Sequence, residues 1–506
     1  MAQHAANLTP IHGGGPIDNP QVDTPSTGYK SMIPAWDRAD ALQSTDRMRA
    51  SGIKYLPENN GEETDEWEAR RDRTFLLTSF RDAILKTVAR PFSRPVQIAG
   101  DDNPDIVDEI AKDMDLAGAS LHDFARDAFE DCVHFGKCHV FVDFPNNPER
   151  SITKRPYCIL YSPRDVLAWR HERDADGKDQ LTHLRVRTRS IEAKGDWGEV
   201  AIDQIKVYDA PLNEKKIQGS TTFRTFTQQE GKDTWVEDTT DKGTGVLDYP
   251  GIPFITIYTS KLRFFVATSP FDDLGWLNIR HWQTTSEQNN ILHIARVPIL
   301  VESGVPETKG GPRTIGSGRR IRIPGPQEAK IYYAEHSGKS IDSGFKDIET
   351  LEIKMLRLGS EAFEQREKTA TGERIDDSKS SSQAQEWVMS LEQGFKKVFE
   401  AVQIWDQLKV DGSLREDLPD DFGVVVWSDF QDIGGGVNDQ SLDAGRARGD
   451  VSQRLWLTEM QRGGKISETV DIDEEIQATQ DEIQPPTPPP IPTVEPPEVI
   501  DGGTAA

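Results

Sequence analysis

Four thiol and imidazole side chains of the types that bind zinc lie close together in the sequence: Cys132, His134, Cys138 and His139. Cysteine thiolates and histidine nitrogens are the usual ligands of structural zinc sites. A predicted helix ends at Gly136, however, and in the strand predicted to follow it, neighbouring side chains point to opposite faces. The four groups are therefore not expected to converge. Buried free cysteine is the commoner use of such residues, and the sequence favours no metal here.

Two acidic clusters offer carboxylate oxygens that could bind a cation. The first has Glu172, Asp174 and Asp176 followed by Gly177, as in the opening half of a calcium loop. The twelfth position of that loop is His183, where calcium loops have a bidentate glutamate, so a solvated Asp-Gly hairpin is the favoured interpretation. The second cluster is interpreted as a solvated helix face. Its members are Asp471, Asp473, Glu474 and Glu475.

Motifs for phosphate binding and nucleophilic catalysis are missing from the sequence. Gly464-Lys465 is preceded by Glu459 at the position where a phosphate-binding loop has its first glycine. There is no His-Glu-x-x-His zinc motif and no Gly-x-Ser-x-Gly nucleophile motif. We therefore predict a protein that is not an enzyme and needs no cofactor or metal. A metal-dependent hydrolase using the acidic clusters is the enzyme alternative.

The composition excludes several classes of protein. The 506 residues carry a formal net charge of −26, which argues against a protein that coats nucleic acid, because phosphate binding needs cationic surface. Three cysteines are too few for a disulfide framework and suggest synthesis in a reducing compartment. No apolar run approaches the ~20 residues that span a bilayer, so we expect neither a secreted nor a membrane protein.

Two polar segments stand out against this background. Residues 309–330 have a net charge of +5, with Glu328 as the one acidic residue, and interleaved glycines make them an adaptable loop. Such a loop suits a phosphate backbone or an acidic protein surface, with a plain solvated loop as the alternative. Residues 365–382 are a long polar link between two predicted helices, which indicates disorder or a working loop. The basic side chains of the first segment are Lys309, Arg313, Arg319, Arg320, Arg322 and Lys330.

Hydrophobic periodicity predicts the elements that position these segments. The expected fold class is α+β, with an antiparallel β-rich insert at about 145–260 between helical regions. Expected helices are Glu68–Ala89, Leu121–Phe135, Pro270–Ala295, Phe345–Ala362 and Ser381–Leu408. Expected strands are Cys138–Phe144, Leu181–Thr188, Gln204–Tyr208, Thr222–Thr227, Ile252–Thr259, Ile299–Glu302, Ala329–Ala334 and Val424–Trp427.

The longest predicted helix carries an apolar stripe at a mean spacing of about 3.5 residues, which favours a helix-packing seam within or between protomers. Its members are Ala384, Trp387, Leu391, Phe395, Val398, Val402 and Trp405.

The order of these elements resembles the portal proteins of tailed bacteriophages. The most telling stretch runs from Asp273 through Asn278, His281 and Gln283 to Ala295, and is similar to the family pattern D-L-A-x-L-N-x-x-H-Y-Q followed by S, N, A and P-x-L. Gly275 stands where the family commonly has alanine. Further similarity lies in Phe80-Arg81-Asp82-Ala83, Leu121-x-x-Phe124-Ala125, Ile252-Pro253-Phe254 and Thr369-Ala370-Thr371. Together these motifs span about residues 74–403.

The resemblance implies a protomer with a helical stem and wing, an antiparallel β insert in the wing, a small clip and a helical crown. The implied parts are a flexible N-terminal arm (1–30), the wing with its β-rich insert (31–269), a first stem helix (270–300), the clip (301–342), a second stem helix (343–364), a tunnel loop (365–382), the long wing helix and strand (383–437), the crown (438–483) and a proline-rich disordered tail (484–506).

The resemblance also implies a function without catalysis. It is that of a ring, usually of twelve copies, at one capsid vertex of the virion, made in the host cytoplasm, through which double-stranded DNA enters and leaves without sequence-specific binding. Implied partners are other copies of the chain, the major capsid protein, the terminase large subunit and the head-tail adaptor, with no membrane. The clip would dock partners through the basic residues of 309–330. The tunnel loop would meet DNA through Lys368, Thr369, Thr371, Arg374, Lys379 and Ser380. Another virion ring or scaffold protein, such as an adaptor, is the alternative of the same class.

Overall fold

The computed structural model describes residues 21–100, 103–145, 155–215, 218–228, 234–240, 242–295, 299–303, 330–334, 339–360, 382–410, 418–419, 422–428, 446, 448, 452–462, 472 and 475–477. The chain divides into two compact units, Met1–Ser428 and Asp429–Ala506. Each is described by itself.

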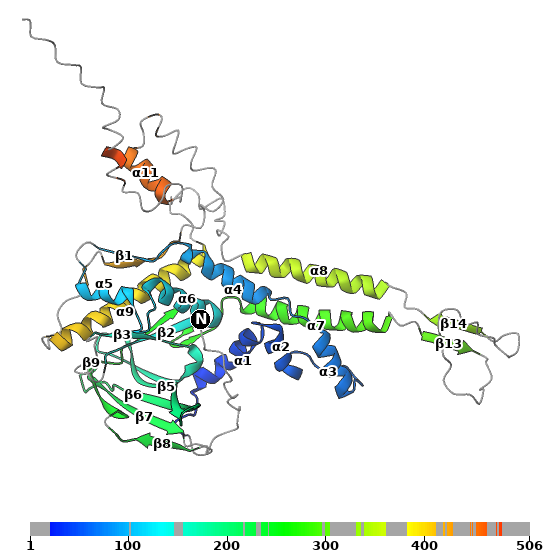
Figure 1. Ribbon diagram of the computed structural model, residues 1–506, viewed down its shortest axis with the longest axis horizontal. Coiled ribbons are helices and arrows are strands. Elements are labelled where there is room, and N and C mark those ends of the chain that lie inside the picture. Colours follow the sequence, from blue (N-terminus) through cyan, green and yellow to red (C-terminus); the bar gives the residue numbers. More distant parts are fainter. Residues whose placement is uncertain are drawn as a thin grey trace, which may run out of the picture. The chain divides into compact units, whose positions relative to one another are not determined.

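The first unit combines helices with antiparallel strands (Figure 1). Its α-helices are α1 (Thr27–Ala41), α2 (Thr45–Ala50), α3 (Thr64–Arg73), α4 (Ser79–Ala89), α5 (Asp105–Lys112), α6 (Leu121–Phe135), α7 (Asp272–Ala295), α8 (Lys339–Ser360) and α9 (Gln383–Val410). Its strands are β1 (Gln97–Ala99), β2 (Lys137–Asp143), β3 (Tyr157–Tyr161), β4 (Val166–Arg173), β5 (Asp179–Lys194), β6 (Gly198–Asp209), β7 (Ser220–Gln228), β8 (Trp235–Asp238), β9 (Thr244–Pro250), β10 (Phe254–Tyr258), β11 (Lys261–Arg263), β12 (Val266–Ala267), β13 (Ile299–Ser303), β14 (Lys330–Ala334) and β15 (Gly423–Val425).

Two sheets form the β-rich part of this unit. One has the order β10-β2-β3, and the other has the order β4-β5-β6-β7-β8 with β9 also paired to β7. The pairs β1-β15, β11-β12 and β13-β14 are separate, and the described strand pairs are all antiparallel. The expected α+β class with an antiparallel β insert is therefore confirmed, while the portal-like arrangement of its parts stays a prediction.

Helix α6 shows why the local sequence predicted its ends well. The hydroxyl of Ser120 accepts a hydrogen bond from the backbone N–H of Asp123, which satisfies a donor at the helix start. Gly136 ends the helix in the left-handed conformation, with φ of +87°. Between these caps the apolar face is buried against β2 and α4.

Helix α9 buries its stripe against strands and also against helices α5 and α6, where Phe395 packs edge-on against Phe124. The stripe is almost completely buried, and α9 contacts β10, β15 and β9. Gly394 passes so close to the sheet that a Cβ atom there would lie 2.5 Å from Cγ1 of Ile257. Near its C-terminal end the indole N–H of Trp405 donates to the Val142 carbonyl at 2.9 Å. The predicted helix packing of this stripe is therefore found in part, at α5 and α6, and strands complete the surface that covers α9. Packing between protomers stays a prediction.

The predicted single helix over Glu68–Ala89 is also wrong, because α3 and α4 are separated by extended chain. At the end of α3 the hydroxyl of Thr74 donates back to the Arg70 carbonyl at 2.8 Å. The Thr74 carbonyl accepts from the Arg49 guanidinium at 3.0 Å. These contacts replace the next helical turn although the apolar spacing continues across it.

Part of the predicted N-terminal arm is helical. Helix α1 begins at Thr27, and Tyr29 is buried in a cluster with Met32, Trp36 and Val266. The phenol of Tyr29 donates to the Arg164 carbonyl at 2.9 Å, a contact 135 residues away in sequence. Local composition carries no signal for such a contact.

The acidic loop between β4 and β5 is a hairpin turn, as the sequence predicted. The Asp174 carboxylate accepts hydrogen bonds from the backbone N–H groups of Asp176 and Lys178 at 2.9 and 2.8 Å. Gly177 has φ of +81°, which suits a turn. The carboxylate oxygens of Asp174 thus serve the turn itself.

The second unit contains α11 (Gln453–Arg462) among its described residues. The predicted crown, 438–483, is described in too few places for its assignment to be tested.

Candidate functional site

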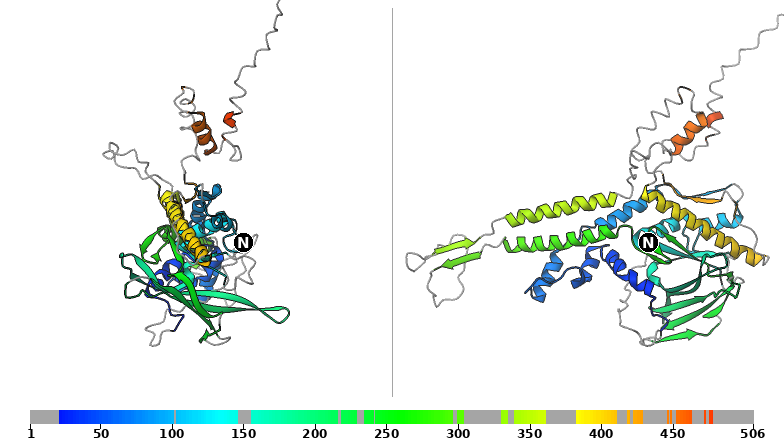
Figure 2. Two further views of the ribbon diagram at one scale, coloured as in Figure 1. Left: turned by 90° about the vertical axis from the view of Figure 1, so that its left-hand side faces the viewer. Right: turned by 180° about the vertical axis from the view of Figure 1, so that it is seen from behind.

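The motif-bearing helix α7 and helix α8 lie side by side and run antiparallel (Figures 1 and 2). They have 24 and 22 residues, which corresponds to lengths of roughly 36 and 33 Å. The antiparallel direction follows from two contacts: His281 Nε2 lies 3.3 Å from Glu352 Oε1, and Gln288 donates to the Ile341 carbonyl at 2.9 Å. The strands β13 and β14 between these helices in the sequence pair with each other, Ile299 opposite Ala334.

The start of α7 is fixed by an arginine from α1. The Arg38 guanidinium, almost fully buried, forms an ion pair with Asp272 and lies over the Trp276 ring at 4.2 Å from its centroid. Attraction to a carboxylate and to an aromatic face at once holds the first turn of α7 against α1. The motif residues gave no signal for Arg38, because it lies 234 positions away in sequence.

Asn278 of the motif has no exposed surface, and its amide joins α7 to the start of α4. The side-chain oxygen accepts from the Phe80 backbone N–H at 3.0 Å, while the side-chain nitrogen donates to the Leu77 carbonyl at 2.8 Å. Asparagine suits this position because it supplies one acceptor and one donor together.

Gly275 lies against Leu42 and Phe80, and a Cβ atom there would be 3.3 Å from the Leu42 side chain. The close approach explains how glycine fits a position where the resemblance led us to expect alanine.

Ser286, further along α7, meets a buried ion pair from α3. Arg70 donates to both carboxylate oxygens of Glu62 at 2.7 Å, to the Pro57 carbonyl at 2.8 Å and to the Ser286 hydroxyl at 3.2 Å. The hydrogen bond from Arg70 holds the pKa of Glu62 below its usual value. The positions along α7 thus make structural contacts to α1, α3, α4 and α8.

The segment that leads into α7 is held by the junction of α6 and β2. A Cβ atom on Gly136 would lie 2.1 Å from the Thr268 carbonyl oxygen, so the two backbones are in close contact. The next residue, Lys137, is fully buried, and its ammonium donates to the Phe265 carbonyl at 2.5 Å. The rings of Trp169, Phe265 and Trp36 surround it at 5.1, 5.6 and 5.9 Å. Burial lowers the pKa of Lys137 to about 7.

Helix α8 exposes three large apolar side chains among the described residues, whereas α7 exposes one, Trp276, which lies under the Arg38 guanidinium. Phe345, Ile353 and Leu356 are 47%, 69% and 71% exposed, whereas Leu351 and Met355 on the opposite face are buried. Ile353 and Leu356, together with Glu349 and Glu352, line a surface groove of about 340 Å³. Apolar surface of this kind on a long helix is typical of a face that another molecule covers.

The predicted partner and DNA residues fall largely outside the described part of the chain. This applies to the whole predicted tunnel-loop set and to Lys309, Arg313, Arg319, Arg320 and Arg322. Lys330 is the exception, since its backbone begins β14 opposite Ser303. The docking and tunnel roles therefore stay predictions.

The thiols of Cys132 and Cys138 interact with each other, but the four side chains of the Cys/His cluster do not form one group. Cys132 contacts the Ile257 carbonyl, His134 contacts Gln43 and Asp40, and His139 contacts Thr256. Among the described residues no group of three or more His, Cys, Asp and Glu side chains could hold a metal ion. Nor does any described helix have the length and apolar character needed to span a bilayer.

Comparison with known proteins gives one sequence match and a limited structural similarity. A family model, described as a domain of unknown function (DUF4055), matches residues 270–406, the range that contains α7, α8 and most of α9. No curated protein matches the sequence.

Two solved structures are similar at 10% sequence identity. One comes from the neck of an empty gene transfer agent (GTA) particle computed with C6 symmetry, with a TM-score of 0.37, covering 76% of this chain and 89% of that one. The other comes from the virion of a native gene transfer agent particle, with a TM-score of 0.35, covering 90% of this chain and 98% of that one. Scores at this level establish neither a shared fold nor a shared function.

Proposed function

We propose that the chain is the protomer of a bacteriophage portal ring, a structural component of the virion that provides a channel for DNA and has no catalytic activity. The observation that carries the proposal is the antiparallel α7–α8 pair. It is anchored to α1, α3 and α4 at the motif positions, and it exposes apolar side chains along α8.

An isolated chain leaves this α8 surface in water, and a closed ring covers it. In a cyclic assembly each subunit presents one surface to its neighbour on one side and a different surface to its neighbour on the other side, and the contacts close without leaving a free end. The overall charge of −26 suits a conduit for DNA, because an acidic wall with few cations does not retain phosphate groups during transit.

The proposal assigns α7 and α8 to the stem, the segment between these two helices to the clip and residues 365–382 to the tunnel loop. The basic residues of the clip would contact the terminase and the head-tail adaptor. Reversing Arg319 and Arg320 to glutamate is expected to weaken binding of both partners at low salt while rings still form, because loop charges act on association more than on folding. Unchanged binding of both partners by the double variant would remove the docking role.

Particle imaging tests the proposal directly. Negative-stain micrographs of the purified chain are expected to show rings with a central hole, and mass photometry to show a single multiple of the subunit mass. A protein that stays monomeric or dimeric across micromolar concentrations would contradict the proposal.

A further inference from the structure

The far end of the β5–β6 hairpin extends beyond the sheet to which it belongs. Strand β4 pairs with β5 only as far as Val186, and β7 pairs with β6 only from Gln204 onward. Between these limits residues 187–203 form a two-stranded ribbon, and no third described strand pairs with it. Figure 2 shows this ribbon standing out from the rest of the first unit, to the side of the α7–α8 pair.

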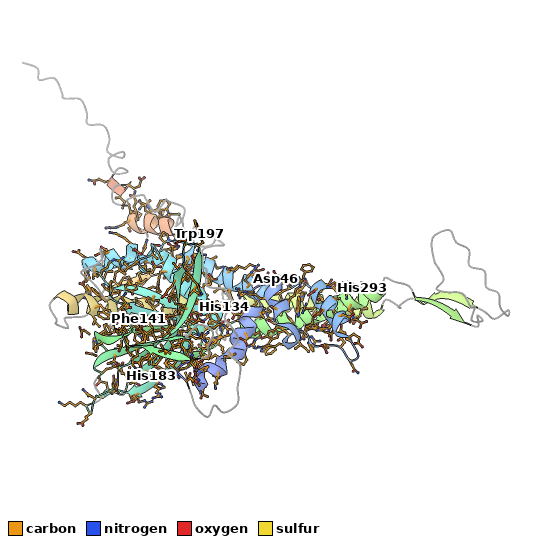
Figure 3. All side chains as sticks on the ribbon, turned by 60° about the horizontal axis from the view of Figure 1, so that its bottom comes forward. Asp46, His134, Phe141, His183, Trp197 and His293 are labelled. Atoms are coloured by element: carbon orange, nitrogen blue, oxygen red, sulfur yellow. The ribbon has the colours of Figure 1, made fainter. Side chains whose placement is uncertain are left out.

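The ribbon has little to stabilise it within the chain. A two-stranded hairpin in water is marginal unless further strands or a packed face support it. Arg189 and Asp203 form an ion pair across the ribbon, with Nε and Oδ1 2.6 Å apart, and its exposed setting makes it weak. Ile191 is 68% exposed and Trp197, in the turn, is 99% exposed (Figure 3). Exposing a tryptophan completely at the end of a protruding ribbon is costly unless another surface covers it.

The charges of the ribbon indicate what kind of surface that is. Residues 187–203 have a net charge of −1, so neither a phosphate backbone nor an anionic lipid surface attracts them. A protein surface of mixed charge suits them, with tryptophan as the buried anchor, because tryptophan is enriched at the energetic centres of protein interfaces. The charged members are Arg187, Arg189 and Lys194, and Glu192, Asp196, Glu199 and Asp203.

We infer that the ribbon is an arm that contacts a second copy of this chain, with Trp197 packed on the neighbouring subunit. The inference rests on the proposed ring, and it names a contact within that ring. In a ring whose axis runs along these helices, an arm that extends sideways along the ring, and not outward from it, meets the neighbouring subunit. The neighbouring subunit also supplies a surface that covers the ribbon, which its own chain does not provide.

The native cysteines make a direct test possible. Cys132, Cys138 and Cys158 have no exposed surface, so a thiol introduced by Asp196→Cys, in the same turn and with Trp197 kept, is the reactive one among the described residues. The variant is labelled with a maleimide-benzophenone photocrosslinker, assembled from a mixture of ¹⁴N and ¹⁵N chains and analysed by mass spectrometry. Mixed-isotope crosslinks within the ring are expected. The matched control is Lys178→Cys, which places the label at the exposed turn at the opposite end of β5 and is expected to give at least about tenfold fewer of them.

A second measurement follows the concentration at which rings form. Trp197→Ser is expected to raise the midpoint concentration of assembly at least about tenfold. Trp197→Phe is expected to keep this concentration close to that of the parent protein, since an aromatic anchor is retained. Rings that form with the parent midpoint and without mixed-isotope crosslinks would overturn the arm while leaving the proposed ring intact. Absence of rings in the parent protein would overturn both. Crosslinks only to another virion protein in purified particles would replace the second copy as the partner.

Discussion

The contacts of α7 with the rest of the protomer and the β5–β6 ribbon use polar and apolar residues in opposite ways. Along α7, polar groups such as Asn278 and the Arg70 guanidinium that bonds to Ser286 are buried, and each bonds to a different element. On the ribbon, Trp197 and Ile191 are apolar and exposed. Buried polar groups fix how the chain folds on itself, because each must find one specific partner. Exposed apolar groups instead indicate surfaces that are completed by another molecule. The difference distinguishes residues that stabilise the protomer from residues that assemble protomers. Substitutions in the first region should therefore lower the stability of the protomer, and substitutions in the second should weaken its assembly.

The largest effect is expected at Gly136. Substitution by alanine places a Cβ atom 2.1 Å from the Thr268 carbonyl oxygen at a residue with φ of +87°. We expect the free energy of unfolding to fall by about 3 kcal/mol or more, since backbone must move on both sides of the contact. Urea denaturation followed by circular dichroism measures the change.

Gly177→Ala is the matched control for that substitution. Its φ is +81°, but nothing lies within 4 Å of the added Cβ atom. Only the conformational cost of about 1–2 kcal/mol remains. Equal losses in the two variants would show that the close approach to Thr268 has no energetic importance.

A smaller effect is expected at Asn278. Replacement by leucine leaves the Phe80 N–H and the Leu77 carbonyl without their side-chain partners in the interior. The cost is about 2–3 kcal/mol, the penalty for buried groups left unsatisfied. Asn103→Ala, which removes two local bonds at a partly exposed site, should cost less than ~1 kcal/mol. A stability for Asn278→Leu equal to that of the parent would contradict the assignment of this amide as a structural contact.

The buried Lys137 should make the stability of the protein depend on pH. Its pKa is about 7 in the folded chain against 10.5 for an ordinary lysine, so the unfolded chain binds more protons between these values and stability rises with pH. The free energy of unfolding is expected to rise by ~1 kcal/mol between pH 7 and 8. This interval lies below the ordinary pKa of cysteine, so the three cysteines contribute little to the slope. Burial also lowers the pKa of His139, which adds a slope of the same sign mainly below pH 7. Lys137→Met should flatten the slope between pH 7 and 8, and Lys178→Met, at an exposed lysine, should leave it unchanged. A parent protein whose stability is constant over this interval would show that the surrounding aromatic rings and the Phe265 carbonyl keep Lys137 charged.

The smallest effect on the protomer is expected on α8. Ile353→Asp with Leu356→Asp changes two exposed side chains, so the free energy of unfolding of the isolated chain should change by less than ~0.5 kcal/mol per site. Assembly, in contrast, should be lost, because the substitutions place charges in a surface proposed to be covered. Lys354→Ser is the control at a neighbouring exposed position. Rings of normal yield from the double variant would show that this face stays in solvent.

The sequence predicted most elements because their signals are local. The caps at Ser120 and Gly136 gave α6, and the spacing of apolar residues gave α7, α8 and α9. The break between α3 and α4 was missed because Thr74 and Arg49, not the apolar spacing, end the helix.

The candidate site was harder to predict than the fold. The motif on α7 identified Asn278, His281 and Gln283, but their partners lie far away in sequence, and neither Arg38 nor Lys137 belongs to a recognisable motif. Nothing in the sequence pointed to the proposed arm, because its alternating polar strands are typical of any solvent-exposed hairpin. The segment Gly195-Asp196-Trp197-Gly198 does indicate a turn that carries an aromatic residue.

The two contacts that pin α9 to the sheet give this helix a mechanical property. Gly394 is fitted around Ile257, and the Trp405 indole is bonded to the Val142 carbonyl, at points 11 residues apart and therefore roughly 16 Å apart along the helix. A helix held by one contact can slide or rotate about it, but a helix held by two separated contacts can do neither without breaking one of them. A force applied to the chain at Gln383, where α9 begins, is therefore delivered to the three-stranded sheet as a whole. Helix α9 and the sheet therefore move as one rigid body, and any displacement at the N-terminal end of the helix is shared by β2, β3 and β10.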